Sequence, residues 1–228
     1  MKRKLFTLAV ICTALFFTGC GDVSYVDSES VDQNSILQCY SIGYDAQTQM
    51  LSCEATFRVD NMSGSRVRLT GSSSVNCDKE AMTFENGCYF LGKDCPKEPG
   101  KVTFNYVNND GRKFVNAFKF KSIDTKSESI TLTQGTANTL TFQGKKANEY
   151  DRFYLVMKRD GQEDVEIEAS EADGNELTFA ADDLSSLAKG TFDAQLVRRT
   201  EGTNVKAADR GGFWNAEYAS VLKKVTIK

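Results

Sequence analysis

The sequence predicts an all-β protein, and three observations support this. Apolar and polar residues alternate with a period of two through most of the chain, as they do in half-buried strands. These runs recur about every 8–12 residues and are separated by turns rich in Gly, Asn and Asp, a spacing typical of sandwiches and barrels. The only helix-like segment is short, at residues 180–190.

The first half of the chain contains four prominent strand-like segments, which are 36–44, 49–59, 101–107 and 113–120. In the second of these, Leu51, Cys53 and Phe57 share one face. Asp110-Gly111 lies between the last two segments and suits a turn with positive φ. A second tight turn, ENG, precedes the segment CYFL. These features predict one β-sandwich over residues 36–122.

The alternation lapses over residues 123–129 (IDTKSES), which are predicted to form a linker. It then restarts and continues to the C-terminus. The strand-like segments of this half are 129–135, 138–144, 151–161, 163–170, 175–181, 191–199, 213–220 and 223–228. They predict a second β-sandwich over residues 130–228, so that two sandwiches follow one another along the chain.

The segment DLSSLAKGTFDAQLV, residues 183–197, resembles a connection of immunoglobulin-like and fibronectin type III-like modules. In those modules a Leu-x-x-Leu turn and a glycine lead into a strand that opens with an aromatic residue. Leu184, Leu187, Gly190 and Phe192 fill these places. A Phe replaces the usual Tyr, so no hydroxyl is present for a corner hydrogen bond. The resemblance covers about 15 residues of the second sandwich, and it implies nothing about a ligand. Together with the strand pattern of both halves, it leads us to predict two tandem immunoglobulin-like β-sandwiches.

The N-terminus has the parts of an export signal. A basic start at residues 2–4 is followed by the uncharged residues 5–17, too few for a membrane-spanning helix, which needs about 20. The next residues, TGC, resemble the lipobox of bacterial lipoprotein precursors, with Phe17 where Leu is usual. In that family the cysteine is acylated before the signal is removed. The resemblance implies a signal peptide over residues 1–19 and lipidation of Cys20.

Residues 20–35 carry the predicted lipidated cysteine and a polar, acidic stretch that is predicted to be a flexible tether. Gly21 stands where Asp would indicate inner-membrane retention in Gram-negative lipoproteins. By this resemblance the predicted location is the bacterial cell envelope, with the outer membrane favoured if the source is Gram-negative. The predicted partner at this end is membrane lipid, held through Cys20.

The composition excludes several function classes. The chain contains no histidine, which removes Ser-His-Asp and Cys-His catalysis and His-ligated zinc. Without the signal peptide the chain has 25 basic and 31 acidic residues, which gives a net charge of −6. This balance argues against a nucleic-acid partner, which needs a basic face. No cofactor or metal site is predicted.

Five cysteines remain after the signal and Cys20 are set aside, and all lie in the first half. Exported proteins can keep disulfides, so at most two bridges are expected, and the fifth cysteine stays a thiol or pairs with another molecule. A hairpin of 36–44 and 49–59 predicts a Cys39–Cys53 bridge if the two residues face each other. For the second bridge Cys88 is paired with Cys95 or with Cys77. The alternative is buried thiols that act as small apolar side chains.

Two features suggest where a ligand binds. Trp214 and Tyr218 share one face of a predicted strand and form a candidate aromatic platform, although a tryptophan at this spacing more often packs in a core. Glu166 and Glu168 also share a face, but they alternate with apolar residues and are interpreted as the solvated side of a strand. No catalytic residue is therefore predicted.

These observations together predict a non-enzymatic, lipid-anchored envelope protein that displays two β-sandwich modules for adhesion or for recognition of a protein or glycan. One alternative is a structural accessory subunit of an envelope or secretion assembly, which an exposed apolar patch would favour. The other is a carboxylate-based envelope hydrolase, which would need two convergent acids from different strands.

Overall fold

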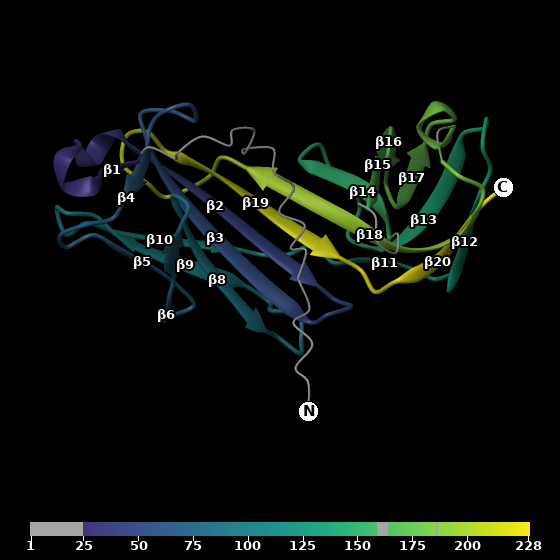
Figure 1. Ribbon diagram of the computed structural model, residues 1–228, viewed down its shortest axis with the longest axis horizontal. Helices are drawn as coiled ribbons and strands as arrows, with labels where there is room; N and C mark the ends of the chain where they lie inside the picture. The colour runs from purple at the N-terminus through teal and green to yellow at the C-terminus, as the bar shows by residue number, and fades with distance from the viewer. Residues whose placement is uncertain (1–24, 159–163, 186) are drawn as a thin grey trace.

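The computed structural model describes residues 25–158, 164–185 and 187–228. In these ranges the regular elements are strands and three short 3₁₀ helices, which confirms the all-β prediction (Figure 1). Among the described residues, no helix has the length and apolar character that crossing a membrane requires. The predicted signal peptide and Cys20 lie outside the described residues.

One twelve-stranded sheet extends from one end of the molecule to the other (Figure 1). Its main path runs β1-β4-β3-β2-β19-β18-β14-β15. Off this path β8 pairs with β3 and β7 with β8, while β20 pairs with β18 and β12 with β20. The strands are β1 Tyr25–Asp27, β2 Ile36–Asp45, β3 Met50–Val59, β4 Arg66–Arg68, β7 Thr83–Glu85, β8 Cys88–Asp94, β12 Ser129–Leu132, β14 Asp151–Lys158, β15 Val165–Glu168, β18 Gly190–Gly202, β19 Gly212–Ala219 and β20 Lys223–Ile227.

Two four-stranded sheets complete the fold, ordered β10-β9-β5-β6 and β11-β13-β17-β16. Their strands are β5 Ser74–Cys77, β6 Glu80–Ala81, β9 Val102–Val107, β10 Lys113–Phe118, β11 Ile123–Thr125, β13 Asn138–Gly144, β16 Glu171–Asp173 and β17 Glu176–Phe179. Each small sheet packs on a different half of the long sheet, because each shares a separate apolar core with it. The result is two sandwiches with one continuous sheet in common.

The first core follows from the alternation of its strands. On β3 the buried residues include Leu51, Cys53 and Phe57, and β9 supplies Phe104 and Tyr106 from the facing sheet. The ring of Phe57 lies 4.5 Å from that of Tyr106, centroid to centroid. Aromatic pairs of this kind contribute about 0.5–1.5 kcal/mol each beyond the area they bury.

The second core has the same origin in its own strands. Phe153, Leu155 and Met157 of β14 are buried, as alternation predicts. In the segment that resembles immunoglobulin-like connections, Leu184 is fully buried in a 3₁₀ turn and Phe192 is half-buried against this core. The connection therefore anchors the start of β18.

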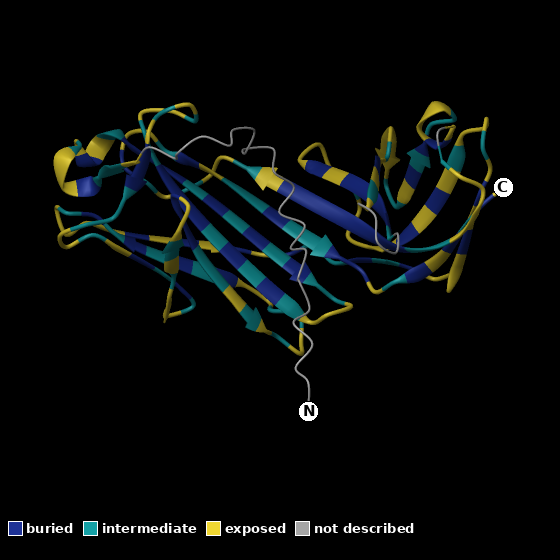
Figure 2. Ribbon diagram, viewed as in Figure 1, coloured by how far each residue is buried: buried dark blue, intermediate teal, exposed yellow. Residues whose placement is uncertain are grey.

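Strand β18 joins the two halves. Its first part pairs with β20 and its last part with β19, and it is buried along most of its length (Figure 2). Strand β19 in turn pairs in parallel with β2, from Gly212 opposite Gln38 to Ala219 opposite Asp45. A strand near the C-terminus thus extends the N-terminal sheet. The residues 123–129 between the halves contain β11 and the first residue of β12.

The described part of the predicted tether, residues 25–35, is packed rather than extended, which corrects that expectation. Strand β1 pairs with β4, and two 3₁₀ turns follow at Ser28–Ser30 and Gln33–Ser35. Ser28 is fully buried, and its hydroxyl accepts a hydrogen bond of 2.8 Å from the backbone of Thr70. Small and polar residues here satisfy buried backbone groups of the first sandwich.

Candidate ligand-binding groove

A groove lies on the face of the shared sheet that points away from the first core. Strand register builds its floor: Glu54 of β3 lies opposite Ser41 of β2, Ser41 opposite Asn215 of β19, and Asn215 opposite Glu201 of β18. A second row lies two residues further along these strands and consists of Thr56, Cys39 and Phe213. The groove therefore crosses four strands and combines residues from both ends of the chain.

The groove has a volume of about 470 Å³. The residues that line it are Cys39, Tyr40, Ser41, Glu54, Thr56, Arg58, Met62, Tyr150, Glu201, Gly202, Thr203, Phe213, Trp214 and Asn215. Cavities of this size accept small molecules or short oligomers.

Two exposed aromatic side chains stand near the Glu201 end of the polar floor. Tyr150 is 58% exposed and Phe213 is 43% exposed, so both rings offer apolar surface to solvent. In the polar row beside them, the hydroxyl of Ser41 donates a 2.7 Å hydrogen bond to the Asn215 side-chain oxygen. The arrangement of apolar rings around a few placed polar groups is typical of a binding site.

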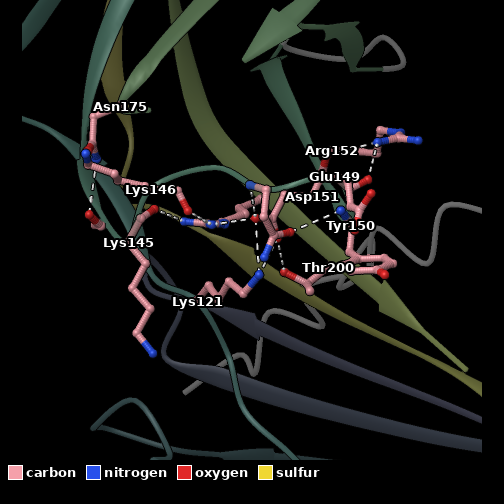
Figure 3. Close-up of polar contacts among 12 residues, drawn as sticks. Lys121, Lys145, Lys146, Glu149, Tyr150, Asp151, Arg152, Asn175 and Thr200 are labelled. Carbon is pink, nitrogen blue, oxygen red and sulfur yellow. Dashed lines mark hydrogen bonds and ion pairs between the residues drawn. The ribbon is translucent and has the colours of Figure 1, made fainter. Parts of the chain in front are cut away.

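A buried ion cluster lies directly behind Tyr150 (Figure 3). The side chains of Asp151 and Arg198 are both 0% exposed, and a guanidinium nitrogen of Arg198 lies 2.6 Å from a carboxylate oxygen of Asp151. Lys121 contributes a second ion pair at 2.8 Å, and the Thr200 hydroxyl donates at 2.6 Å. Burial alone would raise the pKa of Asp151, but the hydrogen bonds from Arg198, Lys121 and Thr200 outweigh it and hold that pKa below its usual value.

This cluster fixes the loop that presents Tyr150. Arg198 also donates to the backbone carbonyls of Lys145 and Lys146, at the start of the loop (Figure 3). At its end the Glu201 backbone N–H donates to the Tyr150 carbonyl at 3.0 Å. Since both ends are held, the ring of Tyr150 stands at the groove on a rigid support.

Trp214 and Tyr218 do not form the candidate exposed platform, and Trp214 packs against the first core, the alternative that its strand spacing favours. Alternation correctly placed them on one face of β19, but that face packs inward. The Trp214 ring stacks on Phe118 with 4.9 Å between centroids, and its indole N–H donates to the Asn204 side chain at 2.6 Å. Tyr218 is half-buried beside Tyr44. Trp214 borders the groove, while Phe213 on the opposite face offers the exposed ring.

The predicted Cys39–Cys53 bridge is wrong, because the hairpin register differs from the one assumed. Cys39 lies opposite Thr56, and Cys53 lies opposite Ile42. The offset is odd, so the two side chains point to opposite faces of the sheet. Cys39 lines the groove, whereas Cys53 is buried in the core.

The predicted pairings of Cys88 are also corrected. Cys88 and Cys95 lie at opposite ends of β8, about 20 Å apart along an extended strand, far beyond disulfide reach. Cys88 lies on the outer face, beside Thr56 of β3 at 3.5 Å, whereas Cys77 is in the core on the other sheet. All five cysteines are thiols in this structure.

Cys39 is not a reactive thiol in this setting. Its sulfur lies 3.5 Å from that of Met62. Burial raises the pKa of Cys39 to about 11, so the thiol stays protonated at neutral pH. It therefore contributes a soft apolar surface to the groove floor.

No protein-family model and no curated protein matches the chain. Among solved structures, it is similar to SGBP-B of the Bacteroides ovatus mixed-linkage glucan utilization locus in complex with a mixed-linkage heptasaccharide (10% identity, TM-score 0.23, covering 80% of this chain and 53% of that one). It is also similar to a tandem of titin immunoglobulin domains (12% identity, TM-score 0.23, covering 85% of this chain and 95% of that one). A third similar structure is the adhesin InvE of Yersinia pseudotuberculosis (12% identity, TM-score 0.25, covering 83% of this chain and 59% of that one). The chain spans just over half the length of the first and third. These likenesses are distant and carry no functional information.

Proposed function

We propose that this protein is a non-enzymatic, lipid-anchored recognition protein of the bacterial cell envelope, which binds an uncharged glycan chain in the groove. The observation that carries the proposal is the pair of exposed rings, Tyr150 and Phe213, beside the polar row from Glu54 to Glu201. Sugars have apolar C–H faces and polar edges, so they fit rings that flank donors and acceptors.

The charge of the groove favours an uncharged chain over an acidic one. Its lining includes two acids, Glu54 and Glu201, and one base, Arg58. Arg58 donates a hydrogen bond to the Gly64 carbonyl at 3.1 Å, so its charge is partly engaged within the protein. Acidic glycans need clustered Arg and Lys, which the lining does not supply.

The spacing of the two acids favours binding over hydrolysis. Glu54 and Glu201 stand three strand spacings apart, about 14 Å between backbones. Glycosidases hold their two carboxyl groups about 5–9.5 Å apart across the scissile bond. The hydrogen-bonded pair of Ser41 and Asn215 occupies the space between the acids.

Titration of neutral oligosaccharides against residues 21–228 tests the groove. We expect a glycan array to identify a neutral ligand, and both Tyr150→Ala and Phe213→Ala to weaken it about 10-fold, equivalent to about 1.4 kcal/mol. Tyr25→Ala is the matched control, because Tyr25 is 43% exposed and is not among the groove residues. Equal affinity in all three variants, or specific binding of a protein instead of a glycan, would contradict the glycan proposal.

The envelope location is proposed from the N-terminal resemblance alone, and it has its own test. In the full chain expressed in a bacterium, Cys20→Ser is expected to abolish labelling by radioactive palmitate and to move the protein from the membrane fraction to the soluble fraction. Cys95→Ser is the control that leaves both unchanged. Palmitate incorporation that persists in Cys20→Ser would disprove the anchor.

A further inference from the structure

Two cysteines that the sequence did not pair lie together in the first core. Cys53 is on β3 of the long sheet and Cys77 is on β5 of the facing small sheet. They are 1% and 0% exposed and belong to the same apolar cluster. Cys77 lies opposite Phe104, whose ring is 4.6 Å from that of Tyr40, centroid to centroid. Tyr40 in turn lies opposite Ala55, two residues from Cys53, so β5 is stacked over this part of β3. They are therefore the two cysteines that face each other across the sandwich.

We propose that Cys53 and Cys77 form a disulfide bond that ties the two sheets of the first sandwich together when the protein is exported. The bond forms by exchange with a disulfide-bearing oxidase of the envelope. One cysteine thiolate attacks the donor disulfide and releases one donor thiol, and the second cysteine then displaces the other. Two protein thiols lose two electrons and two protons, and one donor disulfide becomes two thiols.

The other three cysteines are arranged to stay reduced. Cys39 and Cys88 lie on the outer face of the long sheet, and Cys95 lies just after β8. Cys39 contacts Met62 and Cys88 contacts Thr56. Strand spacing and sheet thickness separate them from the core pair, so the structure selects one pair among five cysteines.

Burial also sets when the bond must form. The interaction with Cys77, followed by burial, raises the pKa of Cys53, so that thiol is protonated in the folded protein, and both cysteines are sealed from solvent. Exchange requires a thiolate with access to the donor. The bond therefore forms before the two sheets close, and it resists reduction afterwards.

Peptide mapping of the exported full chain tests the proposal. The protein is extracted from the envelope, its free thiols are blocked with iodoacetamide in denaturant, and it is digested with chymotrypsin without reduction. Cleavage after aromatic residues and leucine separates Cys53, in fragment 52–57, from Cys77, in fragment 70–84. We expect these two fragments as one linked species, and carbamidomethyl groups on Cys39, Cys88 and Cys95.

A stability measurement provides the second readout. The closed loop contains about 25 residues, so protein that is reduced by dithiothreitol in denaturant and refolded is expected to have a urea midpoint about 1–2 M lower than the oxidised protein. The control Cys39→Ser keeps this response, and the double variant Cys53→Ala with Cys77→Ala loses it. Alkylated Cys53 and Cys77 in the exported protein, or a link from either to a different cysteine, would overturn the proposal, whether or not the groove binds a glycan.

Discussion

At the residue scale, the buried pair of Asp151 and Arg198 shows how burial and hydrogen bonding compete. Removing a carboxylate and a guanidinium from water costs several kcal/mol for each ion. Here the carboxylate is surrounded by Arg198, Lys121 and Thr200, and its pKa remains lowered despite burial. The net stabilisation of such a pair is small, but its geometry is specific. We expect its main effect to be the fixed position of the Tyr150 loop.

Replacing Asp151 leaves the buried charge of Arg198 unpaired, so the variant measures the free-energy cost of burying that charge. Asp151→Asn is expected to lower the free energy of unfolding by about 3–5 kcal/mol at pH 7, because Arg198 is left buried without its counter-ion. The folded pKa of Asp151 is lowered, so its contribution is present above the unfolded pKa of about 3.9 and is lost as the pH falls below it. Urea unfolding of the wild type and of Asp151→Asn at several pH values between 7 and 3 should show that the difference between their free energies of unfolding becomes smaller in acid.

The control for this experiment is Asp164→Asn, which removes a partly exposed ion pair with Lys158. We expect that change to cost less than about 1 kcal/mol. A gap between wild type and Asp151→Asn that stays constant from pH 7 to pH 3 would refute the ionic explanation.

At the element scale, the parallel contact of β2 and β19 depends on a glycine. A Cβ atom on Gly212 would lie 2.2 Å from the Gln38 carbonyl oxygen and 2.8 Å from a methyl group of Val205. Neither the backbone oxygen nor the packed valine can move without loosening the strand pair. Gly212 is therefore required by close approach rather than by its backbone angles.

Gly212→Ala is expected to destabilise the protein by about 1–3 kcal/mol, the usual cost of overpacking. Gly100→Ala is the matched control, since open space surrounds a Cβ at that position. Urea denaturation followed by tryptophan fluorescence reports on the same strand, because Trp214 is two residues away. Equal midpoints for the two variants would show that β2 and β19 tolerate a wider separation.

The hairpin of β2 and β3 shows why the strand register could not be predicted from the sequence. Alternation correctly identified both strands, and Asp110-Gly111 correctly predicted a turn, with Gly111 at a φ of +75°. The β2–β3 turn instead places Gln49 at a φ of +57° and uses the Asp45 carboxylate to accept from two backbone N–H groups. Gln gives no signal for that backbone region, so the sequence did not reveal how many residues the turn contains.

At the scale of the whole molecule, the sandwiches are coupled by shared strands. β19 lies some 170 residues after β2, yet it completes the first sheet, and Ala208 and Ala216 belong to the first core. The first half therefore cannot bury its core before the chain is nearly complete. Such long-range pairing slows folding and makes the halves cooperative.

The fragment of residues 25–122 is expected to lack a cooperative urea transition, because it leaves the edge of β2 unpaired and its core open. Fusing residues 203–220 to it through a Gly-Ser linker supplies β19 and should restore the transition. Circular dichroism and size-exclusion chromatography distinguish the two cases. A fragment that unfolds with the same midpoint as the fusion would show that the first sandwich is independent.

The sequence by itself determined the local features of this protein. Alternation, turn residues and the absence of histidine depend on neighbours along the chain, and they were sufficient to predict strands, an all-β class and the lack of histidine-based catalysis. The tertiary structure decided which strands pair across long distances, which face of β19 packs inward and which cysteines meet. Each of these depends on register and on sheet stacking, where a shift of one residue reverses every side chain and leaves the local pattern unchanged.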